Sequence, residues 1–249
     1  MKHGMKQDWP MPFWIAHRGA GKLAPENTLA AFRQGAQYGY RAFECDVKLS
    51  GDGIPFLLHD DTLDRTTNGH GLAGARSWCE LSLLDAGSWH SRAFAGEPPP
   101  CLDALARFVI ANRCAFNIEL KPTPGQELLT GQVVGHEVRR LWAGSGMLPL
   151  FSSFQPAALA GARETAPEVP RGLLLDALRE GWLEEAQALG CQAVISHHAL
   201  MDRSTVERLH AAGMKALVYT VNDAAAVRRL QADGVDGIIT DAVDKFSPA

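Results

Sequence analysis

Two acidic residues stand one residue apart in the segment ECDV, which ends at Val47. Residues two apart in a strand point to the same face, so Glu44 and Asp46 project together while Cys45 points away. Two carboxylates that face into a protein repel each other unless one is protonated or a cation lies between them. The alternative is an exposed strand with both acids in water, which is the commoner case for an isolated Glu-x-Asp. Strands in a series that alternates with helices are normally covered on both sides, which favours a bound divalent metal.

The segment FNIELKP repeats this pattern, because Asn117, Glu119 and Lys121 share one face of a strand. Glu119 can supply a third oxygen ligand to the same ion. Lys121 can bind a phosphate group or hold a carboxylate in its charged form. A Glu–Lys pair at a solvated strand end is the alternative interpretation.

Two histidines end apolar runs, His17 in WIAH and His59 in IPFLLH. Histidine is the side chain best suited to proton transfer near neutral pH, although one at a strand end is more often structural. Arg18 adds a planar donor fork for two phosphate oxygens, with a surface salt bridge as the alternative. Gly19 would let a substrate approach the backbone closely.

Other strand ends are polar as well. Phe154 and Tyr219 are candidates for an apolar wall beside a substrate. For Ser152, Asn222 and Asp241 we favour the role of helix caps, because short polar side chains accept hydrogen bonds from the first free backbone N–H groups.

Short apolar runs alternate with amphipathic segments, which is typical of βα units that form a parallel sheet. The predicted strands are Phe13–Ala16, Ala42–Val47, Ala115–Leu120, Leu148–Ser152, Gly172–Leu175, Ala193–Ser196, Ala216–Thr220 and Gly237–Thr240. Eight strands with helices between them favour a TIM (β/α)8 barrel over an open doubly wound sheet. His17, Glu44, Asp46, Glu119 and Lys121 then all fall at carboxyl ends of strands, where such barrels place catalytic groups.

The pattern has one long interruption, which runs from residue 48 to residue 100. It begins with a possible hairpin, in which Val47–Leu49 and Ile54–Leu58 flank a Ser-Gly-Asp-Gly turn, and it continues with turn-forming residues. A structureless loop of this length is unusual in a compact domain, so we predict a small inserted subdomain after the second strand. The whole of 12–249 is then a single barrel domain.

The composition points to small-molecule chemistry. The 249 residues are 46% hydrophobic and carry a formal net charge of −4, with no basic run suited to nucleic acid. The five cysteines form no CxxC pair, so neither a disulfide framework nor a zinc ribbon is expected. The segment MKHGMKQDWPMPFW has no apolar core, and no basic amphipathic helix is apparent. We therefore expect a cytoplasmic protein without stable membrane association, and its oligomeric state stays open.

Taken in order, these motifs resemble the glycerophosphodiester phosphodiesterase family, in its bacterial cytoplasmic form. The matching segments are HRGAGKLAPENT (17–28), ECDV (44–47), LLHDDTLDRTTNGHG (57–71), IELK (118–121), SSFQP (152–156), YTVND (219–223) and DGIITD (236–241). The resemblance implies a TIM barrel with a small insertion and one divalent ion held by Glu44, Asp46 and Glu119. It also implies that His17 and His59 are the acid–base pair and that Arg18 and Lys121 contact phosphate. The position of Tyr219 is often tryptophan in the family.

The reaction that the resemblance implies is hydrolysis of a small glycerophosphodiester to sn-glycerol 3-phosphate and an alcohol. Ligands that are all oxygen favour a hard ion, Mg²⁺ or Ca²⁺, over zinc. One alternative is a lysophospholipase D, which would need an apolar groove or rim near the site. A second is a barrel that binds phosphate without catalysis, although binding alone needs no pair of histidines. A barrel isomerase or aldolase built on Lys121 is a third.

Overall fold

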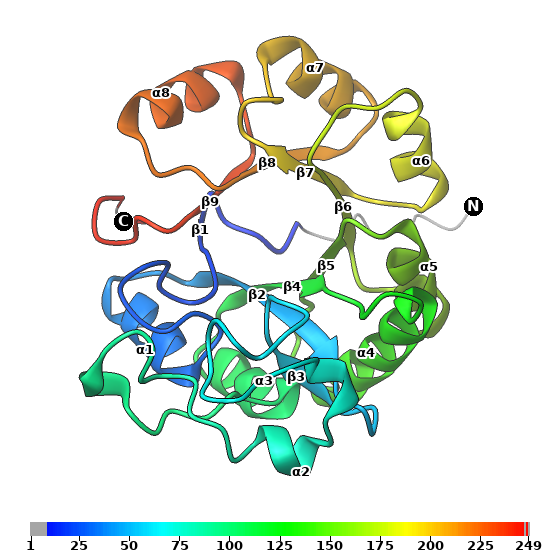
Figure 1. Ribbon diagram of the computed structural model, residues 1–249. Helices are drawn as coiled ribbons and strands as arrows, with labels where there is room; N and C mark the ends of the chain where they lie inside the picture. Colours follow the sequence, from blue (N-terminus) through cyan, green and yellow to red (C-terminus); the bar gives the residue numbers. More distant parts are fainter. Residues whose placement is uncertain (1–8, 247, 249) are drawn as a thin grey trace.

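The computed structural model describes residues 9–246 and residue 248, and it shows a closed ring of parallel strands surrounded by helices (Figure 1). The barrel strands are β1 (Trp14–Ala16), β2 (Ala42–Leu49), β4 (Ala115–Leu120), β5 (Leu150–Ser153), β6 (Arg171–Leu175), β7 (Ala193–His197), β8 (Lys215–Tyr219) and β9 (Gly237–Thr240). The outer helices are α1 (Leu29–Gln37), α3 (Leu102–Ala111), α4 (Glu127–Leu141), α5 (Pro156–Thr165), α6 (Trp182–Ala188), α7 (Arg203–Ala211) and α8 (Ala224–Asp233). The strands pair in the order β1-β9-β8-β7-β6-β5-β4-β2, and the pairing of β1 with β2 closes the ring. The predicted TIM barrel is therefore confirmed.

The strand limits agree with the sequence pattern to within two residues. The largest differences are in β2, which ends at Leu49 and not at Val47, and in β5, which begins at Leu150 and not at Leu148. Pro149 precedes β5 and has no backbone N–H for the ladder, which explains the later start. Residues 1–8, on which part of the expectation about a leader segment rests, lie outside the described residues. Among the described helices, none has the length and apolar character needed to cross a membrane.

Alternate residues of each strand face the barrel interior or the helices. The lower interior is apolar and contains Ile15, Leu150, Leu174, Leu217 and Ile239, which pack against one another. The outward faces of the strands form a separate, larger core with the helices. The acidic residues of β2 and β4 therefore lie above an apolar floor, at the carboxyl ends of the strands.

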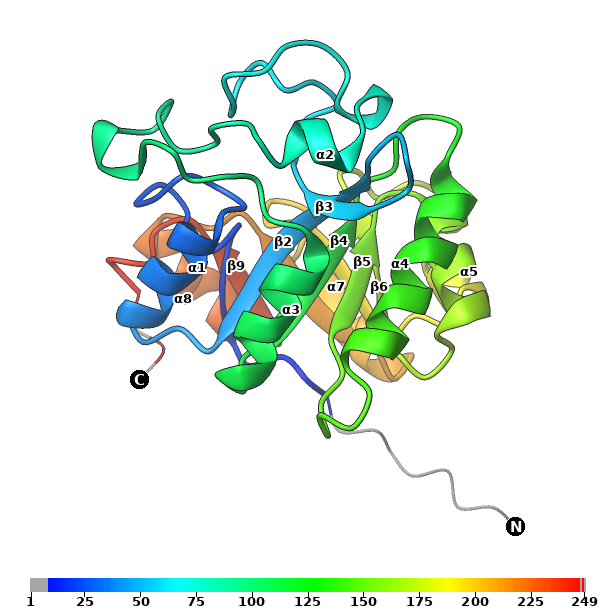
Figure 2. The ribbon, with the colours of Figure 1, turned by 90° about the horizontal axis from the view of Figure 1, so that it is seen from below.

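The segment between β2 and α3 crosses the carboxyl end of the barrel (Figure 2). It starts with β3 (Pro55–Leu57), which pairs antiparallel with the end of β2 and so forms the expected hairpin. The short helix α2 (Trp78–Leu81) follows, capped by Ser77. Phe56, Leu58, Leu63, Ala73 and Leu81 form a small apolar core under this segment. The inserted segment thus has its own packing and lies over the site.

The loop from β1 to α1 holds the first motif in an unusual backbone conformation. Arg18 has a φ of 49°, in the left-handed region that non-glycine residues rarely adopt. Gly19 has a φ of 101°, and a Cβ there would lie 2.8 Å from the Cβ of Ala31. Glycine is thus required at this position because α1 approaches closely. The reason expected from the sequence, close approach of a substrate to the backbone, is a different one. The side chain of Thr28 caps α1.

Candidate active site

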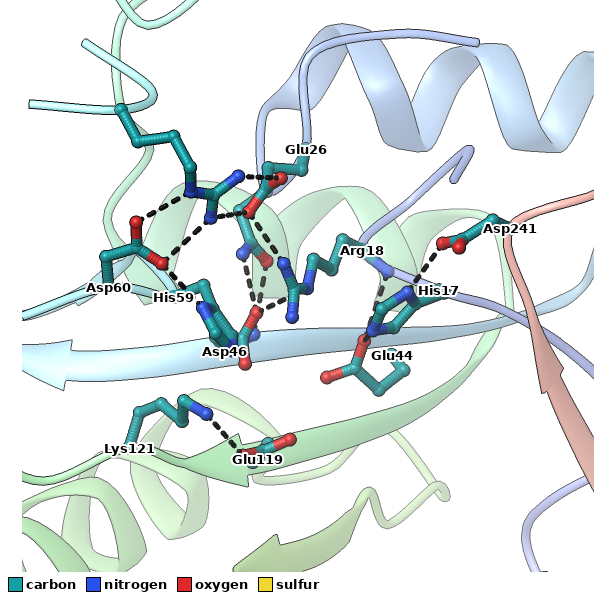
Figure 3. A network of polar contacts seen from close by, with 12 residues as sticks. His17, Arg18, Glu26, Glu44, Asp46, His59, Asp60, Glu119, Lys121 and Asp241 are labelled. Atoms are coloured by element: carbon teal, nitrogen blue, oxygen red, sulfur yellow. Dashed lines mark hydrogen bonds and ion pairs between the residues drawn. The ribbon is translucent and has the colours of Figure 1, made fainter. Parts of the chain in front are cut away.

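Three carboxylates from two neighbouring strands meet in the upper layer of the barrel (Figure 3). In the β2–β4 register Asp46 lies beside Glu119, while Glu44 lies beside Asn117 one layer below. One ligand oxygen from each of the three acids lies within 4.8 Å of the others. Their side chains are 3%, 1% and 12% exposed for Glu44, Asp46 and Glu119. Such a group of buried oxygens is suited to hold a hard cation.

Some of these oxygens have protein partners and others do not. The backbone N–H of Arg18 donates to Glu44 Oε2 at 3.1 Å, and Asn27 Nδ2 donates to Asp46 Oδ2 at 2.8 Å. Glu44 Oε1 and Asp46 Oδ1 are buried and have no hydrogen-bond partner among the described residues. A buried carboxylate oxygen without a partner is costly. The residues present therefore fit a metal ion that these two oxygens would coordinate.

The three acids differ in protonation. Burial raises the pKa of Glu44 well above its ordinary value, and the charges of Asp46 and Glu119 raise it further. Burial, followed by the charge of Asp46, also raises the pKa of Glu119 to about 7. Burial favours the neutral form of Asp46 too, but the charges of Arg18 and other nearby cations outweigh it, so its pKa is lowered. The protein's own cations thus keep Asp46 ionised. Ionisation of Glu44 and Glu119 depends on a further cation.

His17 is held by an acid from the opposite end of the chain. Its Nδ1 lies 2.7 Å from Asp241 Oδ1, so the ring donates from Nδ1 and its Nε2 faces Glu44 Oε2 at 3.8 Å. Asp241 also accepts a hydrogen bond from Asn222 at 3.0 Å. The prediction that Asp241 and Asn222 cap helices is therefore wrong, because the two side chains bind each other across the ends of β9 and β8. The cap of α8 is Asp223.

The prediction that Ser152 caps a helix is also wrong. It lies within β5 beside Glu119, is fully buried, and its hydroxyl has no partner among the described residues. The N-cap position of α5 is occupied by Gln155, with Pro156 at the first helical turn. Ser152 belongs to the inward-facing layer of the barrel.

His59 is held through a chain of charged contacts that links the inserted segment to the β1 loop. Its Nδ1 lies 2.7 Å from Asp60 Oδ1. Arg65 donates to both oxygens of Asp60 at 2.6 and 2.9 Å, and to both oxygens of Glu26 at 2.8 Å. Glu26 also accepts from Arg18 Nη1 at 2.8 Å. Burial lowers the pKa of His59 below its ordinary value, which favours the neutral ring at neutral pH.

The two predicted phosphate-binding cations lie beside the acids. Arg18 Nε is 3.1 Å from Asp46 Oδ2, and Lys121 Nζ is 3.1 Å from Glu119 Oε1. Burial opposes both positive charges, but the surrounding carboxylates outweigh it and raise the pKa of Arg18 and of Lys121. Both side chains therefore stay cationic at the edge of the acidic cluster.

All but one of the predicted site residues line a single cavity of about 190 Å³. It contains His17, Arg18, Glu44, His59, Glu119, Lys121, Phe154 and Tyr219, together with Asn117 and apolar side chains from the floor. Asp46 lies behind Arg18 and is fully buried. The rings of Phe154 and Tyr219 meet edge to face at 5.8 Å and form one wall. A larger cavity of about 510 Å³ at the amino ends of the strands contains none of these residues.

The sequence reasoning missed four residues that support the site. Asp241, Asp60, Arg65 and Glu26 hold the two histidines and Arg18. Asp60 could have been found from its position directly after His59. Asp241 could have been found from its position at the end of the last strand, which adjoins β1 once the barrel closes.

Known proteins match this chain over most of its length. The glycerophosphoryl diester phosphodiesterase family profile matches residues 17–245. A glycerophosphodiester phosphodiesterase of Caldanaerobacter subterraneus is 34% identical over 91% of this chain and 93% of its own.

Solved structures agree with that match. A phosphodiesterase of Oleispira antarctica in complex with the product sn-glycerol-3-phosphate superposes with a TM-score of 0.88 at 37% identity, covering 94% of both chains. A glycerophosphodiester phosphodiesterase of Agrobacterium tumefaciens superposes with a TM-score of 0.79 at 33% identity, covering 94% of this chain and 98% of its own.

Proposed function

Because this chain belongs to the glycerophosphoryl diester phosphodiesterase family and is a glycerophosphodiester phosphodiesterase, we propose that it hydrolyses small glycerophosphodiesters to sn-glycerol 3-phosphate and an alcohol, with a divalent cation. One observation carries this proposal: two histidines face the same cavity as Glu44 and Glu119, which cluster with the buried Asp46. The product named for the Oleispira antarctica structure supports the assignment of sn-glycerol 3-phosphate.

The residues that would hold the cation are Glu44, Asp46 and Glu119. Their ligand set contains only oxygen, and two of their oxygens lack any other partner among the described residues. These properties support Mg²⁺ or Ca²⁺ as the ion. A bound ion of this kind supplies charge neutralisation at the phosphoryl oxygens.

Arg18 and Lys121 would bind the phosphate. Both stay cationic, both line the cavity, and each is already held in place by a carboxylate. The left-handed backbone at Arg18 turns its N–H toward Glu44 while the guanidinium reaches Asp46 and Glu26. Fixed cations at the place where negative charge develops lower the barrier without reorganisation during the reaction.

His17 and His59 would transfer the protons. Each ring donates from Nδ1 to an aspartate, which leaves Nε2 free for the substrate. One histidine takes the proton of the nucleophile and the other gives a proton to the leaving alkoxide. The nucleophile is either a water molecule or a hydroxyl of the substrate's glycerol. In the second case a water molecule then opens the cyclic phosphodiester, with the roles of the two histidines exchanged. Phe154 and Tyr219 would form the apolar wall beside the substrate. The hydroxyl of Tyr219 is held by a hydrogen bond of 3.0 Å to the carbonyl oxygen of Leu175.

The test is an assay of glycerol 3-phosphate release from a panel of glycerophosphodiesters with Mg²⁺, Ca²⁺ or EDTA. We expect turnover with one of the ions and none with EDTA. His17→Ala and His59→Ala should each lose about 100-fold or more in kcat, as is usual when a general acid or base is removed. His70→Ala is the matched control, because His70 is an exposed histidine of the same inserted segment. Near-normal kcat in both site variants would sink the acid–base assignment.

A lysophospholipase D is the second candidate function. This activity would need an apolar groove or rim beside the site, and the inserted segment exposes Leu72 and Leu83, with relative exposures of 58% and 81%. Comparing turnover of lysophosphatidylcholine with that of glycerophosphocholine separates the two candidates.

A further inference from the structure

A second cavity of about 220 Å³ adjoins the first. Both are lined by Glu119, Lys121 and Phe154, and the second extends outward past Asp61 and Glu127. A phosphodiester carries two substituents on one phosphorus atom. With the phosphate at Lys121, in the wall that the cavities share, one substituent can enter each cavity.

The inner cavity contains a polar group suited to the glycerol arm. Asn117 is 1% exposed, and neither its amide nitrogen nor its amide oxygen has a partner among the described residues. A buried amide without partners is costly, and an amide both donates and accepts, as a hydroxyl does. The floor below it is apolar. The inner cavity therefore matches the arm that all glycerophosphodiesters share.

The outer cavity carries an uncompensated negative charge. Lys48 Nζ donates to Asp61 at 2.8 Å and Lys121 pairs with Glu119, so these four charges cancel. Glu127 accepts the backbone N–H of Gly125 at 2.9 Å and has no cation partner in the part of the chain that the structure describes. This hydrogen bond lowers the pKa of Glu127, which keeps the carboxylate charged.

The outer cavity also offers an aromatic face. The ring of Phe154 can hold a cation, as the ammonium of Lys121 shows, which lies 5.7 Å from the ring centroid. An aromatic ring and a carboxylate together attract an ammonium group. We propose that the outer cavity is the subsite of the leaving alcohol and that Glu127 makes it prefer a cationic amino alcohol, such as ethanolamine, over an uncharged polyol. This inference rests on the proposed function.

The experiment compares kcat/KM for glycerophosphoethanolamine and glycerophosphoglycerol, which differ in the charge of the alcohol arm. The wild-type protein should prefer the cationic substrate. Glu127→Gln keeps an acceptor for Gly125 but removes the charge, so it should reduce the preference about fivefold, the size expected for one partly exposed ion pair. The loss should appear in KM for glycerophosphoethanolamine and leave glycerophosphoglycerol unchanged. Added salt should reduce the wild-type preference and leave that of the variant unchanged.

Glu184→Gln is the matched control, since Glu184 lies on α6, outside both cavities. Equal preference in the wild-type protein and Glu127→Gln, or a variant that slows both substrates equally, would overturn the inference while turnover itself upholds the proposed function. If neither diester is turned over, the proposed function fails. Calorimetric Kd values of the two diesters for the wild-type protein with Mg²⁺ then decide the inference separately, and equal values overturn it.

Discussion

At the scale of single residues, the protons on Glu44 and Glu119 should govern binding of the proposed cation. The pKa of Glu119 is raised to about 7 and that of Glu44 lies well above its ordinary value. A protonated carboxyl is a poor ligand, so binding must release these protons. We expect the affinity for Mg²⁺ to rise at least about tenfold from about pH 6 to about pH 8. Calorimetry in two buffers of different ionisation enthalpy measures both the affinity and the protons released.

Glu119→Gln should weaken the affinity and flatten its pH dependence, whereas Glu184→Gln should change neither. Without metal, the stability of the protein should depend on pH in the opposite direction to the Mg²⁺ affinity. A carboxyl whose pKa is raised by folding stabilises the protein below its ordinary value of 4.5, and that contribution is lost as pH rises to about 7. Added Mg²⁺ should raise the melting temperature most at the alkaline end. An affinity independent of pH would contradict the raised pKa values.

At the scale of elements, Arg65 ties the inserted segment to the β1 loop. It holds Asp60, and thereby His59, against Glu26 and Arg18. Arg65→Ala should therefore misplace His59 and lower kcat about tenfold or more, because small displacements of reacting groups are costly in rate. The melting temperature should change little, since Arg65 is 45% exposed. Steady-state kinetics and thermal unfolding measure the two effects.

Arg65→Lys gives a sharper version of this test, because one ammonium cannot bind two carboxylates bidentately. It should recover only part of the lost rate. Arg76→Ala is the control from the same segment, since within the described part of the chain Arg76 forms an ion pair with Glu80 alone. If Arg65→Ala and Arg76→Ala have the same kcat, the proposed link to His59 is wrong.

The elements also show what the sequence can predict. The alternation in ECDV and FNIELK places Glu44, Asp46 and Glu119 on inward faces, and strand pairing then brings them together. Local patterns suffice for these residues. Asp241 and Arg65 were missed because their partners lie far from them in the chain or across a loop of irregular backbone. Periodicity carries no information about such contacts.

At the scale of the whole molecule, closure of the barrel completes the site. The pairing of β1 with β9 places Ala16 beside Thr240, so the residues that follow them, His17 and Asp241, become neighbours across 224 positions of sequence. The stacking of Trp14 on Phe246 at 5.0 Å and the hydrogen bond from Tyr40 to the Phe246 carbonyl hold the same seam. The first and last strands therefore jointly position His17, one of the two proposed acid–base groups.

This closure predicts the effect of Asp241→Asn. The variant keeps a polar group of the same shape but removes the carboxylate that accepts from Nδ1 of His17 and fixes its donating nitrogen, so kcat should fall at least about tenfold with KM little changed. The affinity for Mg²⁺ should not change, because Asp241 contacts His17 and Asn222 and lies outside the carboxylate cluster. Asp244→Asn, an exposed acid three positions further along, is the control. An unchanged kcat in Asp241→Asn would mean that the β1–β9 seam serves the fold alone; a loss of kcat with an intact melting temperature ties barrel closure directly to proton transfer at His17.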